Sequence, residues 1–148
     1  MSTSPFRLTG VGFLGGKCPA RRAPRREWTR DSLNQIIGYL EGGQHCYHYL
    51  QRWITCEFGC DERKCPGVTR FLTHKGYTDG RWVWPVQLIH AVAFHDVDLP
   101  KEFLRTMMQN GWRVPNGLPD FFGARPDIDH TFWEEWFRRH RRPWYVWW

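Results

Sequence analysis

The chain has 148 residues, 41% of them hydrophobic, which is enough for a folded core. Its mean hydropathy is −0.62 and it lacks a run of eighteen uncharged apolar residues, so we expect no transmembrane helix. The start, MSTSPFRLTGVGFLGG, lacks a charged segment followed by an apolar one, so we expect no secretory signal and a cytoplasmic protein. A net charge of +6 with ten tryptophans raises the hypothesis of nucleic-acid binding.

The positive charge is concentrated at the two ends of the chain. Residues 1–30 hold seven basic residues and one acidic residue, and residues 138–148 hold four basic residues and none that is acidic. The stretch between them has ten basic and fourteen acidic residues and is mildly acidic. The ends are therefore either arms that contact phosphates or acidic partners, or solubilising tails that pack on the acidic body.

The five cysteines indicate metal binding or buried thiols. An odd count in a chain without a secretory signal does not support a disulfide framework.

The first half of the chain predicts an arm, a helix and a strand. Residues 1–27 are rich in Gly, Pro and Arg without helical or strand periodicity, which predicts an extended basic arm. A helix is predicted over 29–41, because Thr29 is a good N-cap, apolar residues recur at helical spacing and a Gly pair follows. Residues 45–55 fit a strand or a helix, and we favour the strand.

The second half predicts a hairpin followed by helices. Residues 69–84 indicate a β-hairpin, because Asp79-Gly80 stands between aromatic and β-branched residues. The elements expected after it are a helix over 86–95 led by Pro85, a helix from 98–100 to Asn110-Gly111, a Pro/Gly-rich linker over 112–126, and a last helix from Asp129 or Thr131, with Thr131 and Glu134 as a candidate capping box.

We therefore expect a small α+β fold, zinc-stabilised, with one β-hairpin and three to four helices. Its expected divisions are a basic arm (1–27), a zinc-binding α+β domain (28–112), and a linker with a C-terminal helix and Trp-rich tail (113–148).

Four residues form the strongest chemical pattern: Cys56, Cys60, His90 and His95. A C-x3-C pair on a turn followed by an H-x4-H pair on a helix has spacings used by structural tetrahedral zinc sites. An H-x4-H pair does not align on an ideal helix, so the turn around Phe94 should loosen or become 3₁₀. The alternative is that these residues are buried thiols and hydrogen-bonded histidines without a metal.

Other residues could replace one of these four ligands. Cys65, Cys46, His45 and His48 are competitors, and a site made by Cys46, Cys56, Cys60 and Cys65 is the next arrangement.

The same residues resemble a family of small uncharacterised bacterial proteins. Its pattern is C-x2-C, then TDG-x-W-x-WP, then L-x-H-Y-V-x2-H-x-V-x-L-P-x2-F, and the likeness spans roughly Trp28 to Leu104. This chain differs in having three residues between Cys56 and Cys60, an inserted loop with Cys65, and Ala91 in place of Tyr. The resemblance implies the fold and the metal site and does not imply an activity.

Catalytic motifs are missing from the sequence. Four good ligands would leave no open position on the zinc, and the chain has no H-E-x-x-H, zinc-deaminase, P-loop, G-x-S-x-G or dinucleotide-binding pattern. A Cys46 nucleophile is disfavoured, because its neighbour His45 would face the other side of a strand. We therefore favour a binding module over a zinc- or Cys/His-dependent hydrolase.

Two kinds of partner fit a binding module. The first is a protein, contacted by the aromatic tail and a Trp133/Trp136 stripe, as in an accessory, defence or immunity-type subunit. The second is DNA or RNA, and no membrane partner is expected. Trp28, Trp82, Trp84 and Trp112 are expected in the core and Trp148 at an interface, and the candidate partner-binding residues are Arg21, Arg22, Arg25, Arg26, Arg138, Arg139, Arg141, Arg142, Trp144 and Trp147.

Overall fold

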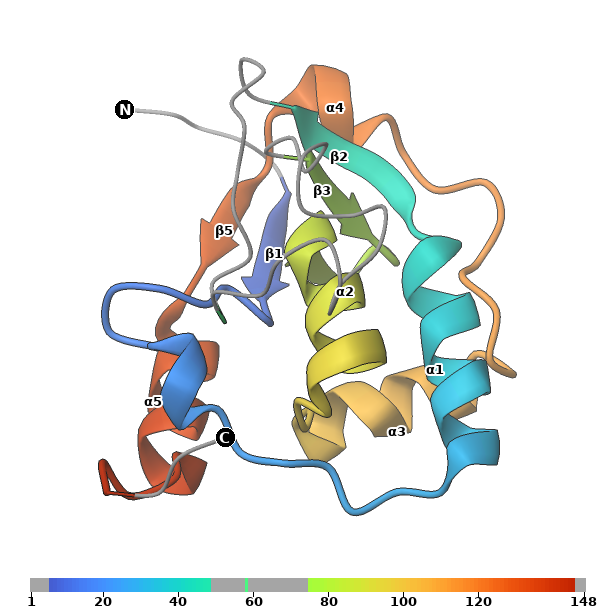
Figure 1. The fold of residues 1–148 in the computed structure, drawn as a ribbon. Coiled ribbons are helices and arrows are strands. Elements are labelled where there is room, and N and C mark those ends of the chain that lie inside the picture. Colours follow the sequence, from blue (N-terminus) through green and yellow to red (C-terminus); the bar gives the residue numbers. More distant parts are fainter. Residues whose placement is uncertain (1–5, 49–57, 59–74, 146–148) are drawn as a thin grey trace.

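The computed structural model describes residues 6–48, 58 and 75–145 (Figure 1). Within these ranges no helix combines the length and the apolar character needed to cross a bilayer. The elements are β1 (Arg7–Gly10), a short 3₁₀ turn η1 (Ala20–Arg22), α1 (Arg30–Glu41), β2 (Gln44–His48), β3 (Lys75–Thr78), β4 (Trp82–Pro85), α2 (Val86–His95), α3 (Lys101–Gln109), α4 (Phe121–Ala124), β5 (Asp127–Asp129) and α5 (Thr131–His140).

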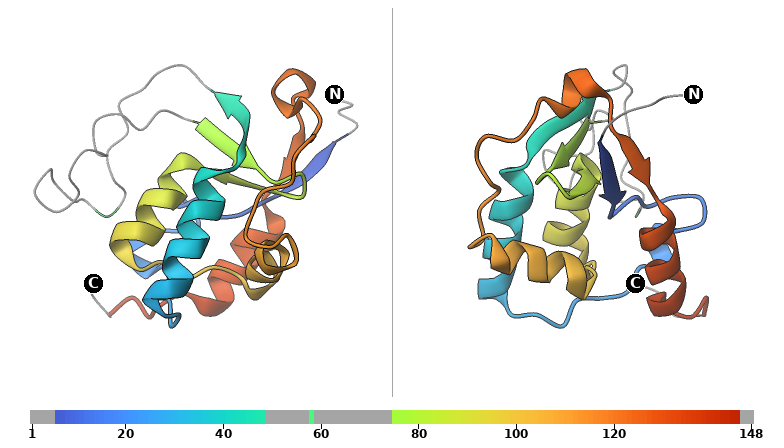
Figure 2. Two further views of the ribbon diagram at one scale, coloured as in Figure 1. Left: turned by 90° about the vertical axis from the view of Figure 1, so that its right-hand side faces the viewer. Right: turned by 180° about the vertical axis from the view of Figure 1, so that it is seen from behind.

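The strands form one mixed sheet in the order β2-β3-β4-β1-β5. The pairs β2–β3 and β3–β4 are antiparallel, whereas β1 runs parallel to both β4 and β5. The expected α+β class is thus confirmed, and the sheet is larger than the single hairpin predicted. Figures 1 and 2 show α1 and α2 side by side along one face of this sheet, with α3 across their ends.

The N-terminal segment does not form the extended arm that we predicted. Residues 7–10 form β1 inside the sheet, and Cys18, Ala20 and Ala23 are buried in the core. A strand of four residues is too short to show a clear alternation of apolar and polar side chains. Its two parallel partners are also distant along the chain, so no local turn marks the pairing.

The sheet separates two hydrophobic clusters. The larger cluster gathers side chains from α1, α2, α3 and α5 around Trp82 and Trp84. Val83 lies between these two tryptophans on β4, and because side chains alternate along a strand it faces the other side of the sheet. There it joins the smaller cluster with Leu8, Cys46 and Phe121. Three of the largest core side chains also have their indole N–H bonded: Trp82 to Thr106 Oγ1, Trp84 to the Leu40 carbonyl and Trp133 to the Phe13 carbonyl.

The turn between β3 and β4 is built around the buried carboxylate of Asp79. Its Oδ1 accepts hydrogen bonds from the amides of Arg81 (2.9 Å) and Trp82 (2.8 Å), and its Oδ2 accepts one from the Tyr39 hydroxyl (2.6 Å). Asn110, just after α3, donates to the same hydroxyl at 2.9 Å. Burial and the Asp79 carboxylate raise the pKa of Tyr39 above its ordinary value, so the hydroxyl stays protonated and can donate.

The helix predictions are largely confirmed, with one correction at α5. Thr29 caps α1 by accepting a hydrogen bond from the Ser32 amide, and α2 and α3 follow the hairpin as expected. The predicted Thr131/Glu134 capping box is wrong, because α5 starts at Thr131 itself with His130 as the N-cap. The Asp129 carboxylate accepts from the Thr131 amide instead.

Three further predictions differ from the structure or extend beyond what it describes. The stretch 112–126 was expected to be a linker only, but it contains the single turn α4, and β5 follows it. The predicted strand over 45–55 is confirmed for the part that β2 covers, and the predicted hairpin over 69–84 for the part that β3 and β4 cover. Residues 49–55 and 69–74 lie outside the described residues.

We predict that the variant Tyr39→Phe loses about 1–3 kcal/mol of unfolding free energy in urea denaturation, because one oxygen of the buried Asp79 carboxylate loses its donor. The matched variant Tyr145→Phe removes a hydroxyl from an exposed side chain and should change stability by less than about 0.5 kcal/mol. Equal stability of the two variants would show that the Tyr39–Asp79 bond does not support the fold.

Candidate metal centre and basic surface

The two histidines of the predicted metal site converge at the end of α2. His90 is buried, and its Nε2 lies 3.3 Å from the Nε2 of His95. The helix loosens at this end as expected: the amides of Asp96 and Val97 both donate to the carbonyl of Ala91, which widens the last turn. A wider turn brings residues five positions apart toward one side of the helix.

The spacing and charge state of this pair suit a metal ion. Two imidazoles bound to one tetrahedral zinc at about 2.0–2.1 Å hold their nitrogens about 3.3 Å apart. Burial and the neighbouring His95 lower the pKa of His90 to about 4, and burial also lowers the pKa of His95. Both rings are therefore neutral at pH 7, which is the form that coordinates metals.

Phe58 lies against one member of this histidine pair. Its ring stacks on His95 with a centroid distance of 4.1 Å and an interplanar angle of 8°. Cys56, Cys60 and Cys65 lie outside the described residues, and each of the first two is two positions from Phe58 along the chain. Within the described residues there is no group of three or more His, Cys, Asp or Glu side chains placed to hold a metal.

Cys46, another of the competitor ligands, belongs to the smaller hydrophobic cluster. Its side chain is 1% exposed among Leu8, Val83 and Phe121, and burial raises the pKa of its thiol to about 11. His45, beside it on β2, has its ring tilted over Phe122 at 5.2 Å.

The basic segment before α1 is fixed against the end of α2. The Arg26 guanidinium pairs with Asp96 at 2.7 Å, and its backbone amide donates to the Asp96 carbonyl. The Asp98 amide donates to the Pro24 carbonyl, and the Asp98 carboxylate accepts from the Trp28 indole. Arg26, which we predicted as a partner-binding residue, is therefore held within the fold by Asp96 and covers Trp28.

The two Arg-rich ends, far apart in sequence, meet in space. Arg22 Nε donates to the Arg142 carbonyl at 2.9 Å, and the Arg142 amide donates to the Arg22 carbonyl at 2.7 Å. Burial and the nearby Arg25 guanidinium lower the pKa of Arg142. Figure 1 shows the η1 segment beside α5. We call this joined region the basic surface and define it by Arg21, Arg22, Arg25, Arg138, Arg139, Arg141, Arg142, Trp144 and Tyr145.

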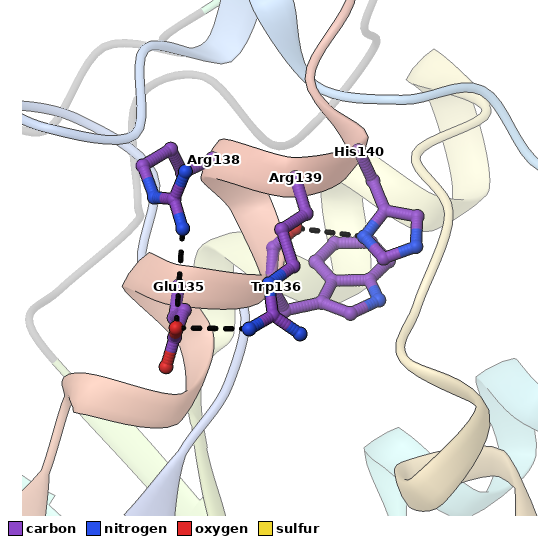
Figure 3. A network of polar contacts seen from close by, with 5 residues as sticks. All are labelled: Glu135, Trp136, Arg138, Arg139 and His140. Carbon is purple, nitrogen blue, oxygen red and sulfur yellow. Dashed lines mark hydrogen bonds and ion pairs between the residues drawn. The ribbon is translucent and has the colours of Figure 1, made fainter.

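The last turns of α5 combine charge with aromatic stacking (Figure 3). The Glu135 carboxylate forms an ion pair with the Arg139 guanidinium at 3.0 Å, and the Arg138 guanidinium lies 3.9 Å from the same oxygen. On the neighbouring side of the helix, the His140 ring stacks on Trp136 at 4.9 Å and 23°. The chain then continues to Trp144 and Tyr145, which are 78% and 64% exposed.

One aromatic prediction is wrong. The Trp133/Trp136 stripe was expected to dock on a partner, but Trp133 is fully buried in the larger core, because α5 packs this residue under the chain at Phe13. Trp82 and Trp84 lie in the core as predicted, and Trp28 and Trp112 pack partly buried against it. Trp147 and Trp148 lie outside the described residues.

Sequence reasoning did not single out two aromatic side chains here: His140 at the end of α5, and Tyr145 in the basic surface. The i, i+4 spacing of His140 from Trp136 on the predicted last helix is a signal that could have identified the first of them.

No family model, curated protein or solved structure matches the chain. The resemblance to the small bacterial family therefore stays a prediction.

We predict that Cys18 and Cys46 are protected from alkylation in the folded protein. Both side chains are at most 2% exposed, and burial raises each thiol pKa to about 11, so the reactive thiolate is about 100-fold scarcer than at the ordinary value. Iodoacetamide at pH 8 should label the two cysteines at least about 100-fold more slowly in buffer than in urea, measured by peptide mass spectrometry. Equal rates in the two conditions would contradict the burial of these thiols.

Proposed function

We propose that the chain is a non-enzymatic binding module with a structural zinc site and a basic, aromatic binding face. The binding face is supported by the reciprocal hydrogen bonds between Arg22 and Arg142, which hold the two Arg-rich ends next to each other. The zinc would be held by Cys56, Cys60, His90 and His95.

The histidine pair and Phe58 support the zinc part of the proposal. The 3.3 Å separation of the two Nε2 atoms fits two corners of a zinc tetrahedron. Cys56 and Cys60 are each two positions from Phe58 in the sequence, and the Phe58 ring stacks on His95 at 4.1 Å. A zinc with four protein ligands has no open position for water, so it would tie the segment around Phe58 to α2 and would not catalyse a reaction.

We predict that the purified protein contains one zinc per chain, measured by inductively coupled plasma mass spectrometry. The variants Cys56→Ser and His95→Ala should each lose the metal and unfold at a lower temperature, because binding free energy of a structural zinc contributes to folding. Cobalt exchanged into the protein should show the intense visible bands of a tetrahedral thiolate site.

The matched control is His130→Ala, which removes an exposed histidine next to α5. This variant should keep the full zinc content. A metal-free protein that is folded and as stable as its chelator-treated form would remove the zinc site from the proposal and leave the binding face to be tested separately.

The basic surface favours a polyanionic partner, of which single-stranded nucleic acid fits best. Arginine side chains contact phosphates, and exposed aromatic rings such as Trp144 stack on bases that are not paired. Burial and the positive charge of Arg25 lower the pKa of Arg142, which indicates that two cationic side chains lie near each other on this surface. The mildly acidic remainder of the chain limits such binding to this surface.

We predict that a fluorescein-labelled single-stranded oligonucleotide binds the protein and that the affinity falls steeply with salt, measured by anisotropy. Replacing Arg21, Arg25 and Arg141 by Gln should weaken binding at least about tenfold and make the salt dependence less steep, because three phosphate contacts are lost. A triple variant of Lys75, Arg105 and Arg113 removes the same charge elsewhere and should bind within about twofold of the wild type.

If both triple variants lower the oligonucleotide affinity equally, binding depends on net charge alone, which would contradict a defined binding face. Absence of binding at low salt would remove nucleic acid as the partner.

A protein partner is the second candidate, and the exposed aromatic side chains of Trp144 and Tyr145 favour it. Trp144 and Tyr145 contact each other edge to face at 5.8 Å and are mostly exposed, and these residue types are common at the centres of protein interfaces. If this candidate is correct, the wild-type protein should form a complex with an acidic protein and should not bind the oligonucleotide. The variant Trp144→Ala should then no longer form that complex.

A further inference from the structure

A pocket of about 600 Å³ lies between β2, α4 and β5, apart from the residues of the basic surface. Its described wall consists of Cys46, Tyr47, Phe122, Gly123, Arg125, Pro126 and Ile128. This volume falls within the range of about 300–1,000 Å³ that is usual for small-molecule sites.

The walls of this pocket are mainly apolar. Tyr47 and Ile128 pack against the smaller hydrophobic cluster, and Phe122 keeps half of its surface exposed although it is a large hydrophobic side chain. His45 holds the Phe122 ring from one side at 5.2 Å. An aromatic side chain positioned in this way offers a flat face to a flat ligand.

Arg125 gives the pocket its one cation among the described lining residues. The residue is exposed, and no carboxylate in the described ranges pairs with it. Its backbone has φ of 49° and ψ of 70°, a left-handed conformation that is unusual for a residue with a side chain. The fold accepts this conformation at the end of α4, where the Arg125 amide donates to the Phe121 carbonyl.

The remaining lining groups do not oppose an anion. Cys46 contributes a thiol that burial keeps protonated and neutral, and Gly123, Pro126 and Ile128 carry no charge. Asp120 is the N-cap of α4, where its Oδ1 accepts from the Gly123 amide.

We propose that this pocket binds a small aromatic carboxylate or sulfonate, with its ring against Phe122 and Ile128 and its anionic group on the Arg125 guanidinium. This site is independent of the zinc and of the basic surface.

The test uses two fluorescent probes of nearly the same shape. The anionic probe is 8-anilinonaphthalene-1-sulfonate, and the neutral probe is N-phenyl-1-naphthylamine, which lacks the sulfonate. Fluorescence titration should give saturable binding of one molecule of the anionic probe per chain. The variant Arg125→Gln should lower the affinity for the anionic probe by about fivefold or more. Its affinity for the neutral probe should be unchanged, because only the sulfonate contacts the guanidinium.

A second variant, Phe122→Ala, should lower the affinity for both probes by about tenfold, because each probe loses its contact with the Phe122 ring. Arg113→Gln is the matched charge control and should leave both affinities unchanged. Retained binding of the neutral probe by Arg125→Gln shows that this variant is folded.

Three results would overturn the proposal. The first is absence of saturable binding of the anionic probe. The second is an equal effect of Arg125→Gln and Arg113→Gln. The third is loss of the anionic probe in the triple variant of Arg21, Arg25 and Arg141, which would place the sulfonate on the basic surface instead.

Discussion

The buried carboxylate of Asp79 holds three parts of the fold in register. It is only 4% exposed, and burying a charge without partners is costly, so the three donors that surround it must stay in place. Two donors are amides of its own turn, and the third is Tyr39 from α1, whose hydroxyl also contacts Asn110 after α3. Helix α1 and the end of α3 are thereby fixed against the hairpin, and the hairpin leads directly into α2, which carries the histidine pair.

The sequence was informative where a structural signal is local. The Thr29 cap, the Asp79-Gly80 turn and the apolar spacing of α2 each depend on a few adjacent residues, and the corresponding elements form as predicted. β1 and β5 were missed because strands of four and three residues show no reliable alternation and because their parallel partners are far away in the chain. The convergence of His90 and His95 could be predicted for the same local reason, since both belong to one helix end.

The basic surface could not be predicted, because it depends on where the chain places two distant segments. The sequence showed an N-terminal and a C-terminal group of arginines, but it did not show that Arg22 and Arg142 would exchange hydrogen bonds. Small buried side chains at Cys18, Ala20 and Ala23 draw the N-terminal segment onto the body, and α5 delivers the second group to the same place. Trp133 was misassigned for a related reason, since an aromatic stripe on a helix predicts burial equally well in a core and in an interface.

The end of α2 links the proposed zinc site with the proposed binding face. His95 is followed at once by Asp96, which is held in a left-handed conformation and paired with Arg26. Residues 24–26 of the N-terminal basic segment run alongside residues 96–98, through the Arg25–Val97 bridge and the Asp98–Pro24 hydrogen bond. A metal that fixes His95 would also restrain these two adjacent segments, and with them the backbone of Arg25. The zinc and the partner would therefore stabilise the same local arrangement, so that each would bind more tightly in the presence of the other.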